Sequence, residues 1–85
     1  MIQDNSKNSL QTEVIAEIAK HLGVTPQDID INAVLSDDLG LGPVEMADLI
    51  AAISVKFDVN FEPADLVSIK SVHDLVVAVE DLSLE

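Results

Sequence analysis

Apolar residues at helical spacing are the feature that most constrains this chain. In its first third they recur every four residues, at Leu10, Val14, Ile18 and Leu22. This interval places side chains on one face of an α-helix. Gly23 follows, and glycine readily takes the left-handed conformation that ends a helix. We therefore predict a helix over about 9–22, a flexible polar start at 1–8, and one globular domain over 9–85.

A proline begins the segment with the most convincing helical pattern, residues 43–57. At the first position of a helix the missing N–H of proline costs nothing, and its fixed φ is already helical. Gly42 supplies the cap before it. Glu45 and Asp48 fall on one face of this helix, and five apolar residues share the other. These are Met46, Leu49, Ile50, Ile53 and Phe57.

Two further helical segments complete the predicted fold. Another proline begins a short turn at about 63–68, and Ser71 and Asp74 form a capping-box pattern at the start of a last helix over 71–82. Between 24 and 42 no helical period survives. Apolar residues there indicate a loop that lies over the core: Ile29, Ile31, Leu35 and Leu39. The prediction is an all-α four-helix bundle with a long ordered loop between helices one and two.

The composition agrees with packed helices. The chain has no Trp, no Tyr and two Phe, so its core must be aliphatic, whereas a sheet sandwich would favour aromatic and Thr-rich strands. Cysteine is absent, which excludes disulfides and thiolate metal sites. At 85 residues the chain suffices for one domain.

The charge balance is strongly acidic. Sixteen Asp and Glu stand against four Lys, for a formal net charge of -12. Nucleic acid is excluded as a partner, because neutralising phosphates requires basic residues. Self-repulsion favours a monomer and predicts that salt stabilises the fold, which a melting temperature independent of ionic strength would contradict. No apolar run is long enough for a signal peptide or a membrane span, so we expect a cytoplasmic protein.

The stretch that leads into the second predicted helix reads Asp37-Asp38-Leu39-Gly40-Leu41-Gly42-Pro43-Val44-Glu45. It resembles the acyl carrier protein family, whose usual pattern here is acidic-Leu-Gly-x-Asp-Ser-Leu-acidic. Segments 18–24 and 69–75 are similar to that family as well, and the similarity extends from about residue 13 to residue 81. The resemblance implies a four-helix fold and a serine that begins helix two and carries 4'-phosphopantetheine.

Laid on this chain, the resemblance places the family's serine at Pro43, its aspartate at Gly42 and its leucine at Val44. Proline has no hydroxyl group to form a phosphate ester. We therefore expect no 4'-phosphopantetheine at Pro43 and no other cofactor.

The resemblance also implies a docking surface for proteins with basic patches, such as carrier-dependent synthases and transferases. The residues expected to form it are Asp37, Asp38, Val44, Glu45, Met46 and Asp48. Further along helix two, Ser54, Val55 and Lys56 stand where the family has an acidic turn, so the predicted surface is altered.

Other residues carry weaker hypotheses. Ser36 is an alternative attachment point, although a turn serine is the favoured interpretation, and two more serines carry less weight still, Ser54 and Ser68. Two histidines stand without a second ligand at metal spacing, His21 and His73. Leu66 occupies a place where the family generally has a small residue near its acyl pocket. We interpret it as a packing residue, and the alternative is that it fills that pocket in a protein that no longer shelters an acyl chain.

Three functions remain open at this stage. The leading one is a non-catalytic binding, scaffold or regulatory protein for fatty acid, polyketide or lipid enzymes that use a carrier. The second is a working acyl carrier protein, with its arm elsewhere or with Pro43 as a variant of the serine. The third is an unrelated acidic helical interaction domain. An enzyme is not expected, because no nucleophile is accompanied by a base.

Overall fold

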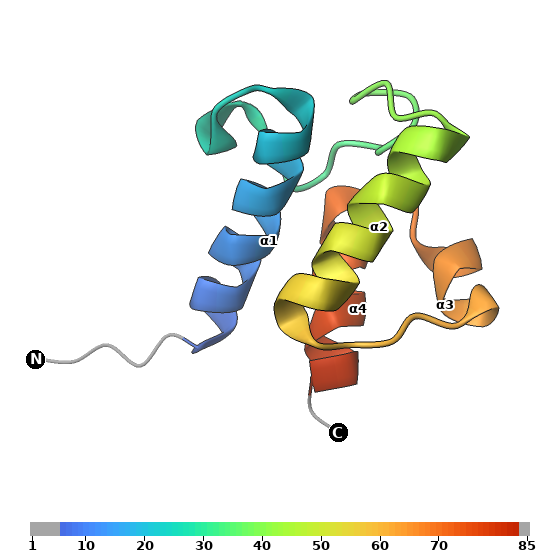
Figure 1. The fold of residues 1–85 in the computed structure, drawn as a ribbon. Helices are drawn as coiled ribbons and strands as arrows, with labels where there is room; N and C mark the ends of the chain where they lie inside the picture. Colours follow the sequence, from blue (N-terminus) through green and yellow to red (C-terminus); the bar gives the residue numbers. More distant parts are fainter. Residues whose placement is uncertain (1–5, 84–85) are drawn as a thin grey trace, which may run out of the picture.

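The computed structural model describes residues 6–83 and contains four α-helices and one 3-10 helix. In chain order they are α1 (Ser6–Leu22), η1 (Pro26–Asp28), α2 (Pro43–Phe57), α3 (Pro63–Ser68) and α4 (Val72–Ser83). α1 packs against both α2 and α4, and the short α3 lies on the far side of α2 (Figure 1). The predicted all-α four-helix bundle is confirmed.

Helix α1 begins at Ser6, three residues earlier than the predicted start at residue 9. Residues 6–8 are therefore helical, and the remainder of the predicted flexible start lies outside the described residues. Backbone hydrogen bonding can extend a helix by most of a turn beyond its first apolar contact, which an apolar pattern does not register. The predicted end is correct. Gly23 has a φ of 74°, and the N–H of Val24 donates to the carbonyl of Ala19 at 3.0 Å.

The core is aliphatic, as the composition predicts. Its largest fully buried side chains come from three helices and the long loop: Val14, Ile18, Leu35, Leu49, Ile53, Val72, Leu75 and Val79. Within the described part of the chain no polar or charged residue is buried. The bundle is therefore held by close packing of branched apolar side chains, each of which contributes roughly 1.5–3 kcal/mol when fully buried.

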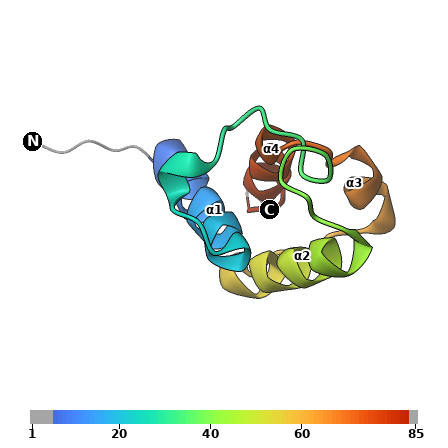
Figure 2. The ribbon, with the colours of Figure 1, turned by 90° about the horizontal axis from the view of Figure 1, so that it is seen from above.

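The loop between α1 and α2 is ordered, and backbone hydrogen bonds show why. The N–H of Leu35 donates to the carbonyl of Lys70 at 2.8 Å, and the N–H of Val72 donates to the carbonyl of Ala33 at 3.0 Å. These bonds surround an antiparallel bridge between Val34 and Ser71. The loop thus crosses the end of the bundle where α1 ends and α2 begins (Figure 2). Helix η1 within it was not predicted, because three residues are too few for a period.

The start of α4 confirms the predicted capping box. The hydroxyl of Ser71 accepts a hydrogen bond from the N–H of Asp74 at 3.1 Å, and the Asp74 carboxylate accepts one from the N–H of Ser71 at 3.1 Å. It also accepts one from the N–H of Lys70 at 3.1 Å. These bonds favour the charged carboxylate and lower the pKa of Asp74, the bond from Lys70 most. No helix among residues 6–83 is both long and apolar enough to cross a bilayer.

Candidate functional site

The start of α2 is built from two residues that contribute no polar side chain. Gly42 precedes the helix in an extended conformation, and its carbonyl accepts the hydrogen bond of the Met46 N–H at 2.8 Å. Pro43 follows as the first helical residue and is exposed. Glycine offers no side-chain cap, and proline offers neither an N–H nor a hydroxyl. This site can therefore begin a helix but cannot form an ester.

A carboxylate covers this helix start. A Cβ atom added to Gly42 would lie 2.8 Å from Oε1 of Glu45, so the Glu45 side chain folds back over the glycine. A negative charge at this end of a helix is stabilised by the helix dipole. The start of α2 does not fit a phosphopantetheine arm because Pro43 has no hydroxyl group that could form the ester.

The six predicted docking residues fall in three places. Val44, Glu45 and Asp48 are exposed on α2, and Val44 has 71% of its surface accessible. Met46 is half-buried and turns toward α3, away from Val44. In the loop, Asp37 is exposed, and Asp38 accepts a hydrogen bond from the N–H of Val34 at 2.8 Å. The structure therefore brings together Val44, Glu45 and Asp48, while Asp38 has a structural role as well.

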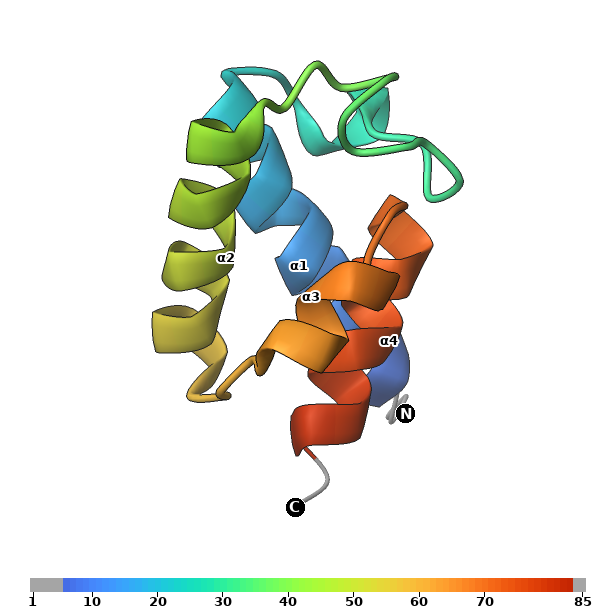
Figure 3. The ribbon, with the colours of Figure 1, turned by 90° about the vertical axis from the view of Figure 1, so that its right-hand side faces the viewer.

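Between α2 and α3 lies an apolar pocket, and it is lined by Leu66, near which the resemblance places the family's acyl pocket. Its volume is about 550 Å³. Its lining comes from both helices and from the segment that joins them: Pro43, Met46, Ala47, Ile50, Ala51, Ser54, Asn60, Phe61, Leu66 and Ile69. The pocket exists because α3 stands off from α2 instead of packing along it (Figure 3). On the α2 side, the small residues Ala47 and Ala51 line the pocket.

The interpretation of Leu66 as a packing residue is wrong. Leu66 is 42% exposed and lines the pocket without filling it. The physical reason is the short α3, which lies beside α4 and carries Leu66 to the edge of the gap. Sequence alone could not reveal this, because the position of a six-residue helix depends on its connections and not on its own pattern.

The serines weighed as alternative attachment points differ in their surroundings. The Ser54 hydroxyl donates to the carbonyl of Val59, and the Ser68 hydroxyl donates to the carbonyl of Asp65 at 3.1 Å. Both hydroxyl groups thus serve local structure. Ser36 is exposed in the loop, 3.5 Å from a carboxylate oxygen of Asp37, and it begins no helix.

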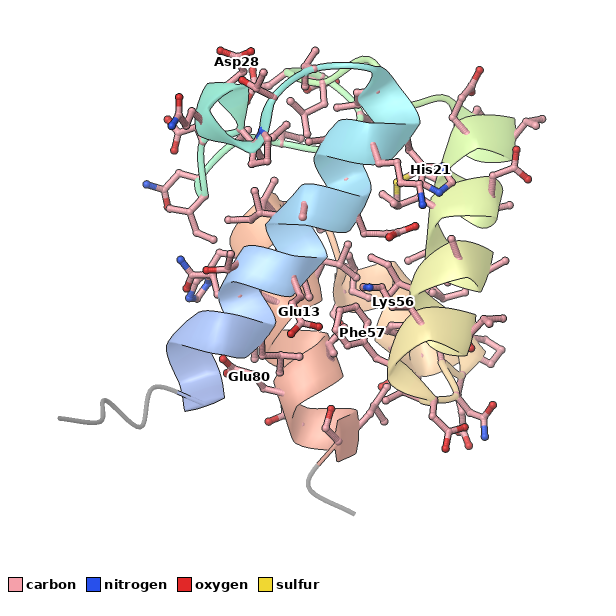
Figure 4. The ribbon with its side chains drawn as sticks, turned by 60° about the vertical axis from the view of Figure 1, so that its left-hand side comes forward. Glu13, His21, Asp28, Lys56, Phe57 and Glu80 are labelled. Atoms are coloured by element: carbon pink, nitrogen blue, oxygen red, sulfur yellow. The ribbon has the colours of Figure 1, made fainter. Side chains whose placement is uncertain are left out.

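His21 lies on α1 and His73 on α4, and neither histidine nor Lys56 lines the pocket between α2 and α3. The His21 side chain lies 3.5 Å from the Glu17 carboxylate on the same helix. Within residues 6–83 no three His, Cys, Asp or Glu side chains are grouped so as to hold a metal ion. Lys56 points from α2 toward α1, and its Nζ lies 5.8 Å from the centre of the Phe57 ring (Figure 4). Its positive charge is therefore not directed at the pocket.

The fold and the helix start define a small helical domain of the carrier type, in which a loop leads directly into an exposed second helix. Residues 12–79, well over half of the chain, match the family model described as the phosphopantetheine attachment site. The chain belongs to this family, that of the acyl carrier proteins.

Individual acyl carrier proteins are similar to this chain over most of its length. The acyl carrier protein of Thermotoga maritima is 32% identical over 75 residues, which cover 88% of this chain and 93% of that protein. The acyl carrier protein of Syntrophobacter fumaroxidans is 33% identical over 67 residues, covering 79% and 83%. That of Chlamydia trachomatis is 26% identical over 73 residues, covering 86% and 95%.

Proposed function

We propose that this chain is an acyl carrier protein family member that carries no arm and acts as a non-catalytic binding or regulatory protein for carrier-dependent enzymes. The observation that carries the proposal is the residue at the start of α2, which is Pro43. We propose that it stands where the family has its modified serine. Since Pro43 has no hydroxyl, 4'-phosphopantetheine has no point of attachment there.

The proposed activity is recognition of proteins with basic patches through the start of α2 and the loop before it. The surface comprises Asp37, Asp38, Val44, Glu45, Met46 and Asp48. In the described residues at this end of α2 the charged groups are acidic, and the whole chain carries a net charge of -12. Opposite charge increases the rate at which a basic partner is captured. The same charge opposes self-association, so we propose a monomer that works in the cytoplasm.

A modification assay tests the loss of the arm. The purified protein is incubated with coenzyme A and a permissive phosphopantetheinyl transferase, and its intact mass is measured. We expect no gain in mass for the wild type. The Thermotoga maritima acyl carrier protein serves as the positive control, and the Gly42→Asp, Pro43→Ser double variant is expected to gain one phosphopantetheine unit.

A gain by the wild type would sink this part of the proposal. Peptide mapping would then identify the modified residue, and modification of Ser36 would favour a working carrier whose arm is attached in the loop. No gain by either the wild type or the double variant, with a modified positive control, would mean that more than the serine is missing from the site.

A charge-reversal pull-down tests docking. The Glu45→Lys, Asp48→Lys double variant changes the charge on exposed α2. The control variant Glu13→Lys, Asp28→Lys makes the same change in charge on α1 and η1, away from α2 in sequence and element, and both control residues are labelled in Figure 4. We expect the first variant to lose partners that the wild type captures and the second to keep them. Equal loss by both would indicate that total charge matters and that the α2 surface is not a specific docking site.

A further inference from the structure

Helix α3 crosses the side of α4, and a second hollow of the surface lies between these two helices (Figure 3). Its volume is about 320 Å³, within the range of roughly 300–1,000 Å³ typical of ligand sites. We name it the α3–α4 groove. None of the six residues of the proposed docking surface lines it. The groove is therefore a separate place on the molecule, and what binds in it does not depend on the proposed function.

One side of α4 supplies much of the groove, and its chemistry alternates along the helix. Asp74 lines the groove, and so do the residues three, four, seven and eight positions after it, which share its side of the helix: Val77, Ala78, Asp81 and Leu82. The two aspartates are separated by about 10.5 Å along the axis at 1.5 Å per residue. This side of α4 thus presents a carboxylate, an apolar stretch and a second carboxylate.

The lining between the carboxylates is apolar. Val77 is 37% exposed, Ala78 and Leu82 are half-buried, and Ile69 adds an apolar side chain from the residue that follows α3. Aliphatic carbon gains free energy by covering such a surface, whereas a hydrated metal ion does not. Within residues 6–83 no three His, Cys, Asp or Glu side chains are grouped so as to hold a metal ion. The groove therefore suits a cation that carries an aliphatic chain.

The carboxylates of the groove are available to such a cation. Asp65 of α3 lines the groove together with Asp74 and Asp81. Oδ2 of Asp65 accepts from the Glu62 N–H at 2.9 Å, and Oδ2 of Asp74 accepts from the N–H of Lys70 at 3.1 Å. A carboxylate accepts at both oxygens, so Oδ1 of each can accept from a bound donor. The bond from the Lys70 N–H also lowers the pKa of Asp74, which keeps this carboxylate charged at neutral pH.

We propose that the α3–α4 groove binds a linear aliphatic polyamine, with one ammonium group at Asp74, another at Asp81 and the methylene chain over the apolar residues between them. Asp65 adds a third acceptor from α3. Amines of this kind are charged at neutral pH, as the lysine side chain is. The ends of the ligand must be about as far apart as the two carboxylates of α4, and this requirement separates a fitted ligand from a diffuse counterion.

The test compares cations of different length by isothermal titration calorimetry at physiological salt. Two amines span the groove, spermidine and octane-1,8-diamine, whereas propane-1,3-diamine and the magnesium ion carry two positive charges without that length. His73 also lines the groove, so the pH is 8, where imidazole side chains are ordinarily neutral. We expect both long amines to bind and both short dications to bind at least about tenfold more weakly, a factor that corresponds to about 1.4 kcal/mol. Equal binding of long and short dications, or no binding of the long amines, would overturn the proposal.

Charge variants locate the bound amine. Asp81→Asn removes one carboxylate of the groove, and Asp48→Asn makes the same change in charge at an exposed position of α2. Circular dichroism verifies that both variants fold. We expect Asp81→Asn to weaken binding of octane-1,8-diamine at least about threefold and Asp48→Asn to weaken it less than about 1.5-fold. Equal weakening would mean that the net charge of the chain holds the amine, and the groove would be ruled out.

A second pair of variants tests the apolar stretch. Val77→Ser makes the groove polar, and Val67→Ser makes the same change on α3 at a residue that is 73% exposed and does not line the groove. We expect Val77→Ser to weaken the binding of octane-1,8-diamine about twofold or more and to leave that of propane-1,3-diamine unchanged, because the shorter chain covers less apolar surface. Val67→Ser should change neither. Equal effects of the two variants on the long amine would contradict the proposed position of its methylene chain.

Discussion

Helices α2 and α4 begin in opposite ways. α4 begins with Ser71 and Asp74, whose side chains satisfy backbone N–H groups at 3.1 Å. α2 begins with Gly42 and Pro43, and no side-chain hydrogen bond caps its first N–H groups. The helices also differ in burial, because α4 buries four residues and α2 buries two. The comparison indicates that α4 contributes mainly to stability. α2 buries fewer residues and leaves much of its surface exposed for contact with other molecules.

The largest effect on stability is expected for α4, the helix that contributes more to the core. Leu75 of α4 is fully buried, so Leu75→Ala should lower the free energy of unfolding by about 2–5 kcal/mol. Val55 of α2 is 83% exposed, and Val55→Ala should change it by less than about 0.5 kcal/mol. Urea unfolding followed by circular dichroism measures both. A large loss for Val55→Ala would mean that Val55 is covered in the folded protein.

The cap of α4 should give the next effect. Ser71→Ala removes the oxygen that accepts from the Asp74 N–H and should cost about 1 kcal/mol, within a range of roughly 0.5–2 kcal/mol. The same unfolding experiment measures this loss. A matched variant, Ser36→Ala, removes an exposed loop hydroxyl and should leave stability unchanged within error. Equal losses would contradict the assignment of Ser71 as a cap.

The cap should also depend on pH. The pKa of Asp74 is lowered in the folded state, chiefly by the hydrogen bond from the Lys70 N–H, so its carboxylate adds stability that is fully present above the unfolded pKa. This contribution is lost as the pH falls through the lower, folded pKa. The stability difference between the wild type and Asp74→Asn should therefore be largest at pH 7 and shrink at about pH 3. A constant difference would mean that ionisation does not matter at this cap.

The smallest effect is expected at the start of α2. Gly42→Asp introduces a capping side chain, but replacing glycine at this position is worth only a few tenths of a kcal/mol. The new Cβ would also meet Oε1 of Glu45 at 2.8 Å, so the Glu45 side chain must move and two carboxylates would lie close together. The net change should be within about 0.3 kcal/mol. A clear stabilisation would show that backbone N–H groups at the start of α2 lack a hydrogen-bond acceptor that a capping side chain can supply.

Local signals made the helix boundaries predictable. Pro43 and Pro63 each stand at the first position of a helix, and the Ser71 and Asp74 pattern places the start of α4 within a residue. The early start of α1 was missed because residues 6–8 are polar and do not continue the apolar period. Helix η1 was missed because it spans three residues.

The candidate site could be predicted only in part. The absence of a hydroxyl at Pro43 follows from the sequence, because residue identity alone decides it. The back-folded carboxylate of Glu45 could not be foreseen, because it depends on a side-chain conformation. Whether the pocket beside Leu66 stays open could not be foreseen either, because that depends on where α3 stands. Nor does a sequence reveal that Lys56, which was expected to alter the docking surface, points toward α1 (Figure 4).

The central claim is that this family member carries no prosthetic arm in the cell. The most direct test is the intact mass of the natural protein, purified without coenzyme A or transferase from the cells that make it. We expect the mass of the unmodified polypeptide. A population heavier by one phosphopantetheine unit would contradict the account, whichever residue held it.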